Sequence, residues 1–250
     1  MIEGKTIAAV IPARGGSLEL PRKNLKKCLQ WSLLEHAIYK AKRCGICDVI
    51  WVSSEDDEIL ETAAAAGIRM DYRRPAAMAE ADSPVEDAIA DILRWHEVNR
   101  DIRTDYVLLL QPTTPLTPPL EIRKALHFLI EKDVDAIVSV CETSCPLGVC
   151  KPLYEFNMRG FLTPEQQRLR RQDMPHLFQL NNCILAAKWD VFAEKKNLYE
   201  TNVIAHIMSP LFSVDINTKT DLMIAQYILQ GILHDRKKRK PVRQSLSDDN

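Results

Sequence analysis

The sequence lacks any apolar run long enough to cross a membrane, and its first residues lack the apolar core of a signal peptide. It also lacks an excess of either charge, because 33 Lys and Arg residues face 34 Asp and Glu residues. We therefore expect no membrane partner and no nucleic-acid partner. The seven cysteines have no regular spacing, which favours a reducing, cytoplasmic location over a disulfide framework.

Several catalytic motifs are also missing. The chain has no G-x-G-x-x-G and no G-x-x-x-x-G-K-[ST], which argues against a dinucleotide site and a P-loop ATPase. It has no G-x-S-x-G, so a serine hydrolase has no support, and no H-E-x-x-H. A single C-x-x-C at Cys44 and Cys47 invites a redox or zinc interpretation, but we expect buried free thiols there.

The most informative stretch runs from Thr6 to Asn24. It opens with a β-branched apolar run, Ile7 to Ile11, which predicts a buried strand. Gly15 and Gly16 follow, and we expect them to turn the chain at positive φ and to let the backbone approach a ligand. The neighbouring cations suit phosphate: Arg14, Arg22 and Lys23. The stretch predicts a triphosphate cradle; the alternative is an ordinary turn.

The rest of the chain alternates strand and helix patterns, which indicates an α/β fold with a mostly parallel, twisted, Rossmann-like sheet covered by helices on both faces. Further strands are expected at Val49–Ser53, Ile68–Tyr72, Asp105–Leu110, Ala136–Val140, Asn182–Ala187, Ile204–Met208 and Leu211–Asp215. Helices are expected around Leu33–Ala41, after Glu55, after a Ser83 or Asp82 cap, and at Leu120–Lys132, Lys188–Ala193 and Asp221–His234. We expect one domain over residues 1–234, an irregular insertion over about 141–181, and a charged tail over 235–250.

Polar residues follow four of these expected strands. Ligands of open α/β sheets bind at the carboxyl ends of the strands, so these residues are expected to converge. They are Arg14 and Ser17, Ser53 to Asp56, Gln111 to Thr114, and Asp215 to Asn217.

Six motifs in order resemble those of the acylneuraminate cytidylyltransferases, the family of CMP-sialic acid synthetases and CMP-legionaminic acid synthases. They are ARGGS with PRKN, VSSEDDEI, Arg74-Pro75 with the Ser83 segment, LLLQPTTPL, RRQDMPHLFQLNNCIL and VDINTKTDL.

This resemblance implies that CMP passes from CTP to the anomeric hydroxyl of a nonulosonic or related keto-deoxy sugar acid, with release of pyrophosphate. It implies a homodimer that exchanges the insertion. The implied nucleotide site is Arg14, Gly15, Gly16, Ser17, Lys23, Asn24, Arg74 and Ser83. The implied sugar-acid site is Gln111, Lys151, Arg171 and Gln179. Arg14, Lys23 and Asp215 would be catalytic, and Asp215 and Asn217 would hold Mg²⁺ or Mn²⁺.

The chain departs from the family pattern at charged positions. Leu18 stands where the family has Lys, and Asn217 stands where it has the second Asp of D-I-D. In the sugar half, Gln179, Asn182 and Leu185 replace an Arg, a Gly and a Tyr. Two alternatives therefore stay open: a weakly active or inactive paralogue that still binds a nucleotide, and a cytidylyltransferase for a different acceptor.

Overall fold

A computed structural model of the protein describes residues 2–17, 19–80, 82–143, 155, 157–168, 170, 176–195 and 197–238. The strands expected at Ile7, Val49 and Asp105 are confirmed. The strands expected at Ala136, Asn182 and Ile204 are also present, although their bounds differ from the expected ones by a few residues. The six strands of the main sheet are β1 (Ile7–Pro12), β4 (Val49–Ser53), β5 (Tyr106–Leu109), β6 (Ala136–Glu142), β7 (Phe178–Lys188) and β8 (Val203–Met208). A separate two-stranded ribbon pairs β2 (Lys27–Cys28) with β3 (Trp31–Ser32).

The strand order of the main sheet is β4-β1-β5-β7-β6-β8. β1 pairs in parallel with β4 and β5, and β6 pairs in parallel with β8. β7 lies between these two groups and runs antiparallel to both neighbours. The sheet is therefore mostly parallel, and the carboxyl ends of β1, β4 and β5 share one edge.

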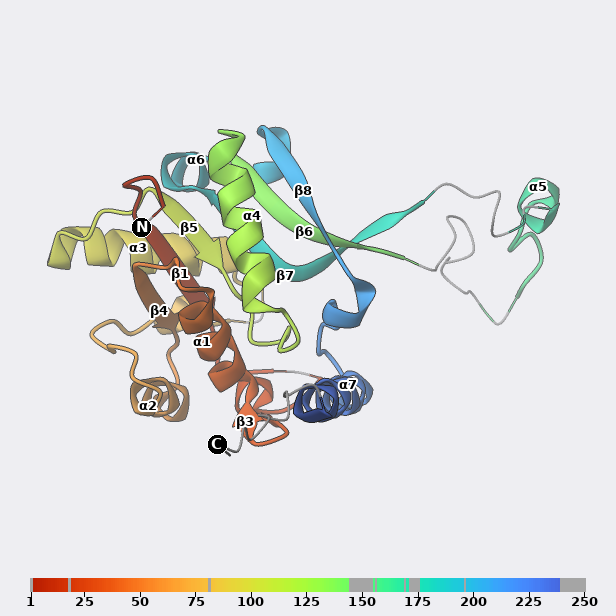
Figure 1. The fold of residues 1–250 in the computed structure, drawn as a ribbon, viewed down its shortest axis with the longest axis horizontal. Coiled ribbons are helices and arrows are strands. Elements are labelled where there is room, and N and C mark those ends of the chain that lie inside the picture. Colours follow the sequence, from red (N-terminus) through yellow and green to blue (C-terminus); the bar gives the residue numbers. More distant parts are fainter. Residues whose placement is uncertain are drawn as a thin grey trace, which may run out of the picture.

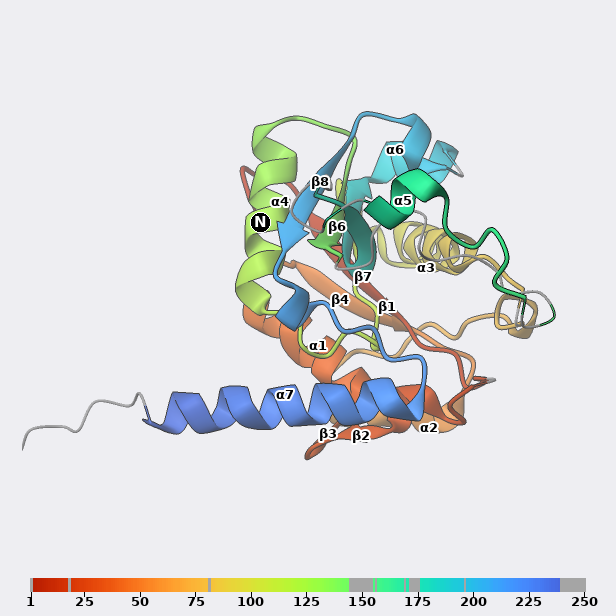
Figure 2. The ribbon, with the colours of Figure 1, turned by 90° about the vertical axis from the view of Figure 1, so that its right-hand side faces the viewer.

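Helices cover both faces of this sheet (Figures 1 and 2). Alternate residues of β1 point to opposite faces, so Ile7 and Ile11 pack with α1 (Leu33–Cys44) and α4 (Pro119–Glu131), whereas Ala8 and Val10 pack with α3 (Val85–Arg100). The helices are α1 (Leu33–Cys44), α2 (Asp57–Ala65), α3 (Val85–Arg100), α4 (Pro119–Glu131), α5 (Pro164–Arg168), α6 (Trp189–Glu194) and α7 (Lys219–Lys238).

Local sequence fixes several of these helix ends. Ser32 and Glu35 form a reciprocal capping box at the start of α1, and Gly45 ends this helix with a φ of 70°. Asp56 caps α2 by accepting from the backbone N–H of Ile59. At the start of α7 the Thr218 and Asp221 side chains cap the helix reciprocally: Asp221 accepts from the backbone N–H groups of Asn217 and Thr218, and Thr218 Oγ1 accepts from the N–H of Asp221.

Three expectations about local structure are wrong. Ile68–Tyr72 is no strand among the described residues. The side chains of Ile68 and Tyr72 are buried, and Asp71 forms an ion pair with Arg100 of α3. Leu211–Asp215 is also no strand, because a 3-10 helix occupies Pro210–Phe212. Neither Ser83 nor Asp82 caps α3, whose N-cap residue is Pro84 without a side-chain bond.

An arm formed by β6, β7 and α5 extends from the body of the protein, and α7 packs separately below the sheet. β6 and β7 continue past the other strands, and α5 lies at the far end of this extension (Figure 1). α7 runs beneath the sheet and buries Ala225 against the segment that holds Leu20 and Cys28 (Figure 2). The expected insertion over about 141–181 coincides with the extension, although much of it lies outside the described residues.

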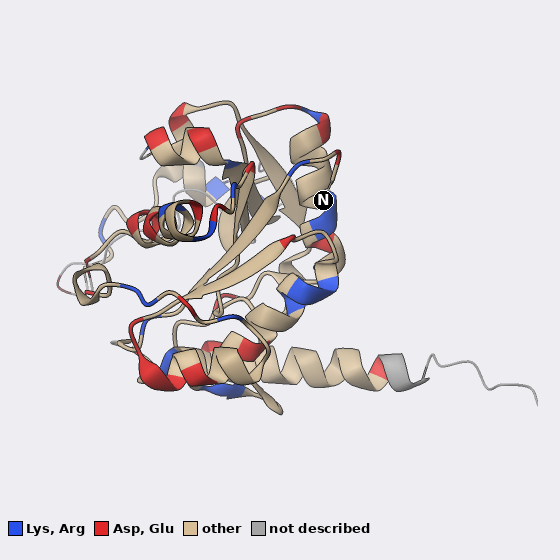
Figure 3. Ribbon diagram, turned by 90° about the vertical axis from the view of Figure 1, so that its left-hand side faces the viewer, with Lys and Arg blue, Asp and Glu red and all other residues tan. Residues whose placement is uncertain are grey.

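Lys and Arg residues alternate with Asp and Glu residues along the helices and loops of the face that Figure 3 shows. Within the part of the chain that the structure describes, no helix combines the length and the apolar character needed to cross a membrane.

Candidate functional site

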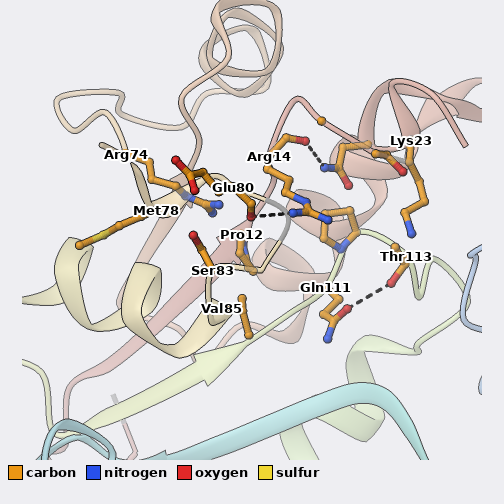
Figure 4. A pocket seen from close by; sticks show the side chains of 14 residues that line it. Pro12, Arg14, Lys23, Arg74, Met78, Glu80, Ser83, Val85, Gln111 and Thr113 are labelled. Atoms are coloured by element: carbon orange, nitrogen blue, oxygen red, sulfur yellow. Dashed lines mark hydrogen bonds between the residues drawn. The ribbon is translucent and has the colours of Figure 1, made fainter. Parts of the chain in front are cut away.

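A cavity of about 320 Å³ lies at the edge of the sheet where β1, β4 and β5 end (Figure 4). Its wall is made by the segment after β1, the segment before α3 and the turn after β5. Eight residues predicted from the sequence line it: Arg14, Gly16, Ser17, Lys23, Asn24, Arg74, Ser83 and Gln111. The structure thus brings together residues from positions 14 to 111 around one space.

Arg14 is held in place at both its main chain and its side chain. Its Nη1 donates to the carbonyl of Glu80 at 2.8 Å, and its own carbonyl accepts from Asn24 Nδ2 at 2.9 Å (Figure 4). The first bond ties the glycine segment to the loop before α3. The guanidinium therefore stands on the cavity wall in a defined position, with donors left for an anion.

The two glycines act differently from expectation, because neither has a positive φ. Gly15 is required for space: a Cβ there would lie 2.5 Å from Asp56 Oδ2. Its N–H donates to Glu55 Oε1 at 2.7 Å, so this amide is already used by the protein. At Gly16 a Cβ would meet no other atom within 4 Å, and this residue lines the cavity, so its backbone is open to a ligand.

Arg22, the third predicted cation of this stretch, does not line the cavity. It has a φ of 57° and forms ion pairs with Asp56 and Glu58 at the start of α2. These two carboxylates hold the pKa of Arg22 above its usual value. Arg22 therefore fastens the glycine segment to α2, whereas Arg14 and Lys23 are left for the cavity.

Arg74 is a buried cation, with 5% of its surface exposed. Its Nε donates to Ser53 Oγ at 3.0 Å and its Nη2 to the carbonyl of Ser53 at 2.6 Å, at the carboxyl end of β4. Burial lowers its pKa below the ordinary value, and the nearby charge of Glu55 opposes that shift. Since arginine stays protonated, Arg74 places a positive charge in a region of low dielectric.

Lys23 lines the cavity and also contacts Asn217, one of the two predicted metal ligands. Its Nζ donates to Asn217 Oδ1 at 3.1 Å, and Asn217 Nδ2 lies 3.3 Å from Asp215 Oδ2. The same carboxylate oxygen accepts from Asn182 Nδ2 at 3.1 Å. Asn182 can reach it because it has a φ of 54° where β7 bulges against β6.

Asp215 suits a divalent cation better than Asn217 does. Its Oδ1 is buried and has no hydrogen-bond partner among the described residues. A free carboxylate oxygen is what Mg²⁺ takes from a protein when phosphates and waters supply its other ligands. Asn217, by contrast, gives its oxygen to Lys23 and turns its nitrogen to Asp215. Among the described residues, no group of three or more His, Cys, Asp or Glu side chains could hold a metal.

The turn after β5 connects the cavity to Asp215. Gln111, Pro112 and Thr113 line the cavity, and the carbonyl of Thr113 accepts from the N–H of Ile216 at 2.8 Å. This bond places the segment around Asp215 beside the turn although no strand precedes it. A second, smaller cavity of about 40 Å³ lies on the other side of Gln111, between β5, β6 and β7.

Some predicted residues lie elsewhere. Gln179 is on β7 opposite Cys141 and lines neither of these two cavities. Lys151, Arg171 and Leu18 lie outside the described residues. Cys44 and Cys47 are free thiols whose sulfur atoms are 3.4 Å apart, at the edge of the sheet opposite the cavity; Cys28, Cys141 and Cys183 are also free, as expected.

Sequence reasoning missed Lys40, which shapes the site, and it missed the role of Glu55. Glu55 belongs to the segment Ser53 to Asp56 that was expected at the strand ends, but the sequence does not show that its side chain accepts from the N–H of Gly15. Lys40 does not stand out, because apolar positions identify α1 and a lysine is not expected among them. The sequence does carry a signal, since Lys40 follows Leu33 and His36 at helical spacing on the buried face.

Two solved structures share this fold. One is a CMP:2-keto-3-deoxy-manno-octonic acid synthetase complexed with CTP, with a TM-score of 0.67, 15% identity, and coverage of 91% of this chain and 99% of that one. The other is a 4-diphosphocytidyl-2C-methyl-D-erythritol synthase from Anaerococcus prevotii, with a TM-score of 0.61, 14% identity, and coverage of 91% and 100%. The sheet and its covering helices define the fold of the nucleotide-diphospho-sugar transferases.

The sequence makes the assignment narrower. The model of the family described as Cytidylyltransferase matches residues 8–214, and the chain belongs to this family. The chain is 29% identical over 230 residues to a CMP-N,N'-diacetyllegionaminic acid synthase of Legionella pneumophila, covering 90% of this chain and 96% of that protein.

Two other relatives act, by name, on related sugar acids. A pseudaminic acid cytidylyltransferase of Campylobacter jejuni is 25% identical over 226 residues, with coverage of 90% and 97%. An N-acylneuraminate cytidylyltransferase of Streptococcus agalactiae is 27% identical over 216 residues, which cover 86% of this chain and 51% of the relative. The chain thus spans about half the length of the streptococcal relative.

Proposed function

We propose that this protein transfers CMP from CTP to the anomeric hydroxyl of a nonulosonic acid of the sialic, legionaminic or pseudaminic type, or of a related keto-deoxy sugar acid. The hydroxyl oxygen attacks the α-phosphorus, the bond to the β-phosphate oxygen breaks, and the hydroxyl proton and pyrophosphate leave. The observation that carries the proposal is the arrangement of Arg14, Lys23 and Arg74 around one cavity at the carboxyl edge of the sheet.

The three cations suit different parts of a nucleoside triphosphate. Arg14 and Lys23 flank the open backbone of Gly16 and Ser17, and we assign them to the phosphate chain. Asn24 would keep its bond to the carbonyl of Arg14 and hold that segment in shape. Arg74 and Ser83 belong to the wall formed by the segment before α3, and we assign them to the cytosine. Fixed positive charges of this kind stabilise the charge that develops on a departing pyrophosphate.

A divalent cation, Mg²⁺ or Mn²⁺, would join the nucleotide at Asp215, whose unpartnered Oδ1 fits such an ion. When bound, it would neutralise phosphate charge and polarise the phosphorus centre. Asn217 would contribute by holding Lys23 beside Asp215, and as a ligand only after its amide releases Lys23.

The sugar acid would lie beyond Gln111, which lines both cavities. The smaller cavity is far too small to enclose a sugar acid, at about 40 Å³, so it can form only part of the acceptor's surroundings. Its lining is mixed, because Gln111, Ser139, Asn182 and Tyr199 accompany the aliphatic residues of β5, β6 and β7. Lys151, Arg171 and Gln179 remain our candidates for the acceptor's carboxylate and hydroxyl groups.

The test is pyrophosphate release from CTP with a panel of acceptors that contains N-acetylneuraminic, N,N'-diacetyllegionaminic, pseudaminic and 2-keto-3-deoxy-manno-octonic acids. Each acid is assayed with Mg²⁺, with Mn²⁺ and with a chelator. Turnover of one acid that requires CTP and a metal supports the proposal. Absence of turnover with every acid, together with unchanged melting in the presence of CTP, contradicts it.

We further propose that the protein is a cytoplasmic homodimer built as one catalytic domain over 1–234. The extension of β6 and β7, with α5 at its end, supports the idea of an arm that reaches a second copy. Exposed apolar side chains on β7, at Phe178 and Leu180, favour the same idea. Sedimentation of the full chain tests it.

A second candidate function is a weakly active or inactive paralogue that binds the nucleotide alone. The observation in its favour is the neutral Asn217, which occupies Lys23 and lies against Asp215. CTP that stabilises the protein equally with and without Mg²⁺, with no turnover of any acid, would support this candidate.

A further inference from the structure

We propose that Lys40 is a positioning residue that fixes the turn after β5 and thereby holds the acceptor side of the site in shape. The inference rests on the proposed function for its catalytic consequence, but the positioning itself can be tested without any substrate.

Lys40 is a buried lysine whose ammonium group is fully used. It lies on the inner face of α1 with 1% of its surface exposed. Its Nζ donates to the carbonyl of Gln111, the carbonyl of Thr114 and the Oγ1 of Thr114, each at 2.9 Å. An ammonium has three donors, so all of them end on one short turn.

Other bonds among the described residues also hold this turn, but none of them ties it to α1. Thr114 Oγ1 donates to the carbonyl of Gln111 at 3.1 Å, Thr117 Oγ1 donates to the carbonyl of Thr114 at 3.0 Å, and the N–H of Ile216 donates to the carbonyl of Thr113 at 2.8 Å. Lys40 adds a charged donor to two of these carbonyls in a largely buried place, where a charge-assisted bond is strong. Without the ammonium, the turn that carries Gln111 and Thr113 loses its support from α1.

The positive charge of Lys40 also interacts with Asp215, the predicted metal ligand. A lone buried ammonium is costly, and the carboxylate of Asp215 favours its charged form. Burial dominates and lowers the pKa of Lys40 to about 8. His36 on the same helix is the other titratable neighbour; its pKa is lowered by burial and further by Lys40. Lys40 therefore supports the turn and also carries a buried positive charge that the carboxylate of Asp215 favours.

The first test uses hydrogen exchange of the full chain, with Lys40→Met compared with wild type. Methionine keeps the unbranched shape but removes every donor. We expect exchange over 110–118 to become faster by about tenfold or more, while the strands β1 and β8 keep their protection. The matched control is Lys42→Met on the same helix, whose Nζ is exposed and donates to the carbonyl of Ala66. It should leave 110–118 unchanged.

The second test is kinetic and uses whichever acid of the panel is turned over. We expect Lys40→Met to lower kcat/KM for the acid by about ten- to hundredfold, because small misplacements of a positioning group cost this much. The Kd for CTP, measured by calorimetry, should change by less than about threefold. Should Lys40→Met fail to fold, Lys40→Gln, which keeps two donors, is measured in the same way.

The pH profile separates positioning from mere stability. Above pH about 8 the amine loses its proton and one donor. In the unfolded chain its pKa is 10.5, so between these values the unfolded state binds more protons and Lys40 makes stability rise with pH. A fall of acceptor kcat/KM above pH about 8 without loss of stability, absent from Lys40→Gln, is expected.

Two results would overturn the inference: unchanged exchange over 110–118 in Lys40→Met, or exchange that rises throughout the sheet while CTP affinity and acceptor kcat/KM fall together. If no acid is turned over by wild type, the proposed function fails, and the exchange experiment alone still decides whether Lys40 holds the turn.

Discussion

Asn217 offers the sharpest test of how this site handles charge. Its amide bridges Lys23, at 3.1 Å from Oδ1, and Asp215, at 3.3 Å from Nδ2. Asn217→Asp adds one negative charge between them with almost no change of volume. Because Asn217 is exposed, solvent screens both new interactions, and the repulsion from Asp215 and the attraction to Lys23 are each worth about 1 kcal/mol or less.

Because these two energies cancel, we expect the free energy of unfolding of Asn217→Asp to stay within about 1 kcal/mol of wild type. Two carboxylates would then lie side by side, with the buried Oδ1 of Asp215 unpartnered, so the affinity for a divalent cation should rise by about tenfold or more. Urea unfolding measures the first quantity. The shift of the melting temperature with MgCl₂ and with MnCl₂, in the absence of substrate, measures the second.

Pyrophosphate release as a function of Mg²⁺ concentration then shows whether the metal bound in this way is useful. The control is Asn182→Asp, which also adds a charge beside Asp215 but at a residue other than the one that accepts from Lys23. It should lose stability, because no cation offsets the repulsion. If Asn217→Asp is destabilised as much as Asn182→Asp, or if its melting ignores both metals, the charge balance inferred for this site is wrong.

Three further predictions concern the cavity and the core. Gly15→Ala should cost about 1–3 kcal/mol in urea unfolding, because its Cβ would lie 2.5 Å from Asp56 Oδ2, whereas Gly16→Ala should be nearly neutral; equal costs at both positions would contradict this. Lys23→Met should weaken CTP binding by about tenfold or more in calorimetry without loss of stability, and exposed Lys26→Met should not; an unchanged Kd for CTP would remove Lys23 from the nucleotide site. His96 is stacked on Trp51 at 3.9 Å, and burial lowers its pKa, so the unfolded chain binds a proton first and stability should fall as pH drops below about 6.5. His96→Phe should flatten this pH dependence in urea unfolding, and an equally steep profile in the variant would refute the assignment.

The parts of the fold that sequence predicted well are those in which one pattern dominates. β1 and β4 are buried apolar runs, and α1 has both a capping box and a terminal glycine. Ile68–Tyr72 and Leu211–Asp215 also contain apolar residues, but neither segment pairs with a strand of the sheet. The local sequence does not show whether a pairing partner is present. Pairing partners decide whether such a segment becomes a strand.

The site residues were predictable where they follow strands, and they were missed where their role depends on a contact with a helix distant in sequence. Arg14, Arg74 and Gln111 follow or face strand ends, so topology alone places them together. Arg22 has the same charge and lies in the same stretch, yet it pairs with Asp56 and Glu58, which only the conformation of the turn reveals. Helical spacing shows that Lys40 lies on the buried face of α1, but its bond to the turn joins residues 71 apart in sequence, and no local pattern contains that contact.

The reversed direction of β7 has a consequence for how such proteins can diversify. Because β7 runs against its neighbours, it is the beginning of this strand, not its end, that meets the edge where β5 delivers Gln111. A segment inserted ahead of β7 therefore enters the sheet beside Gln111, where we propose that the acceptor binds, and leaves β1 and β4 beside the proposed nucleotide site unchanged. Under the proposed function, a change in this single connection alters the choice of acceptor without altering the nucleotide site.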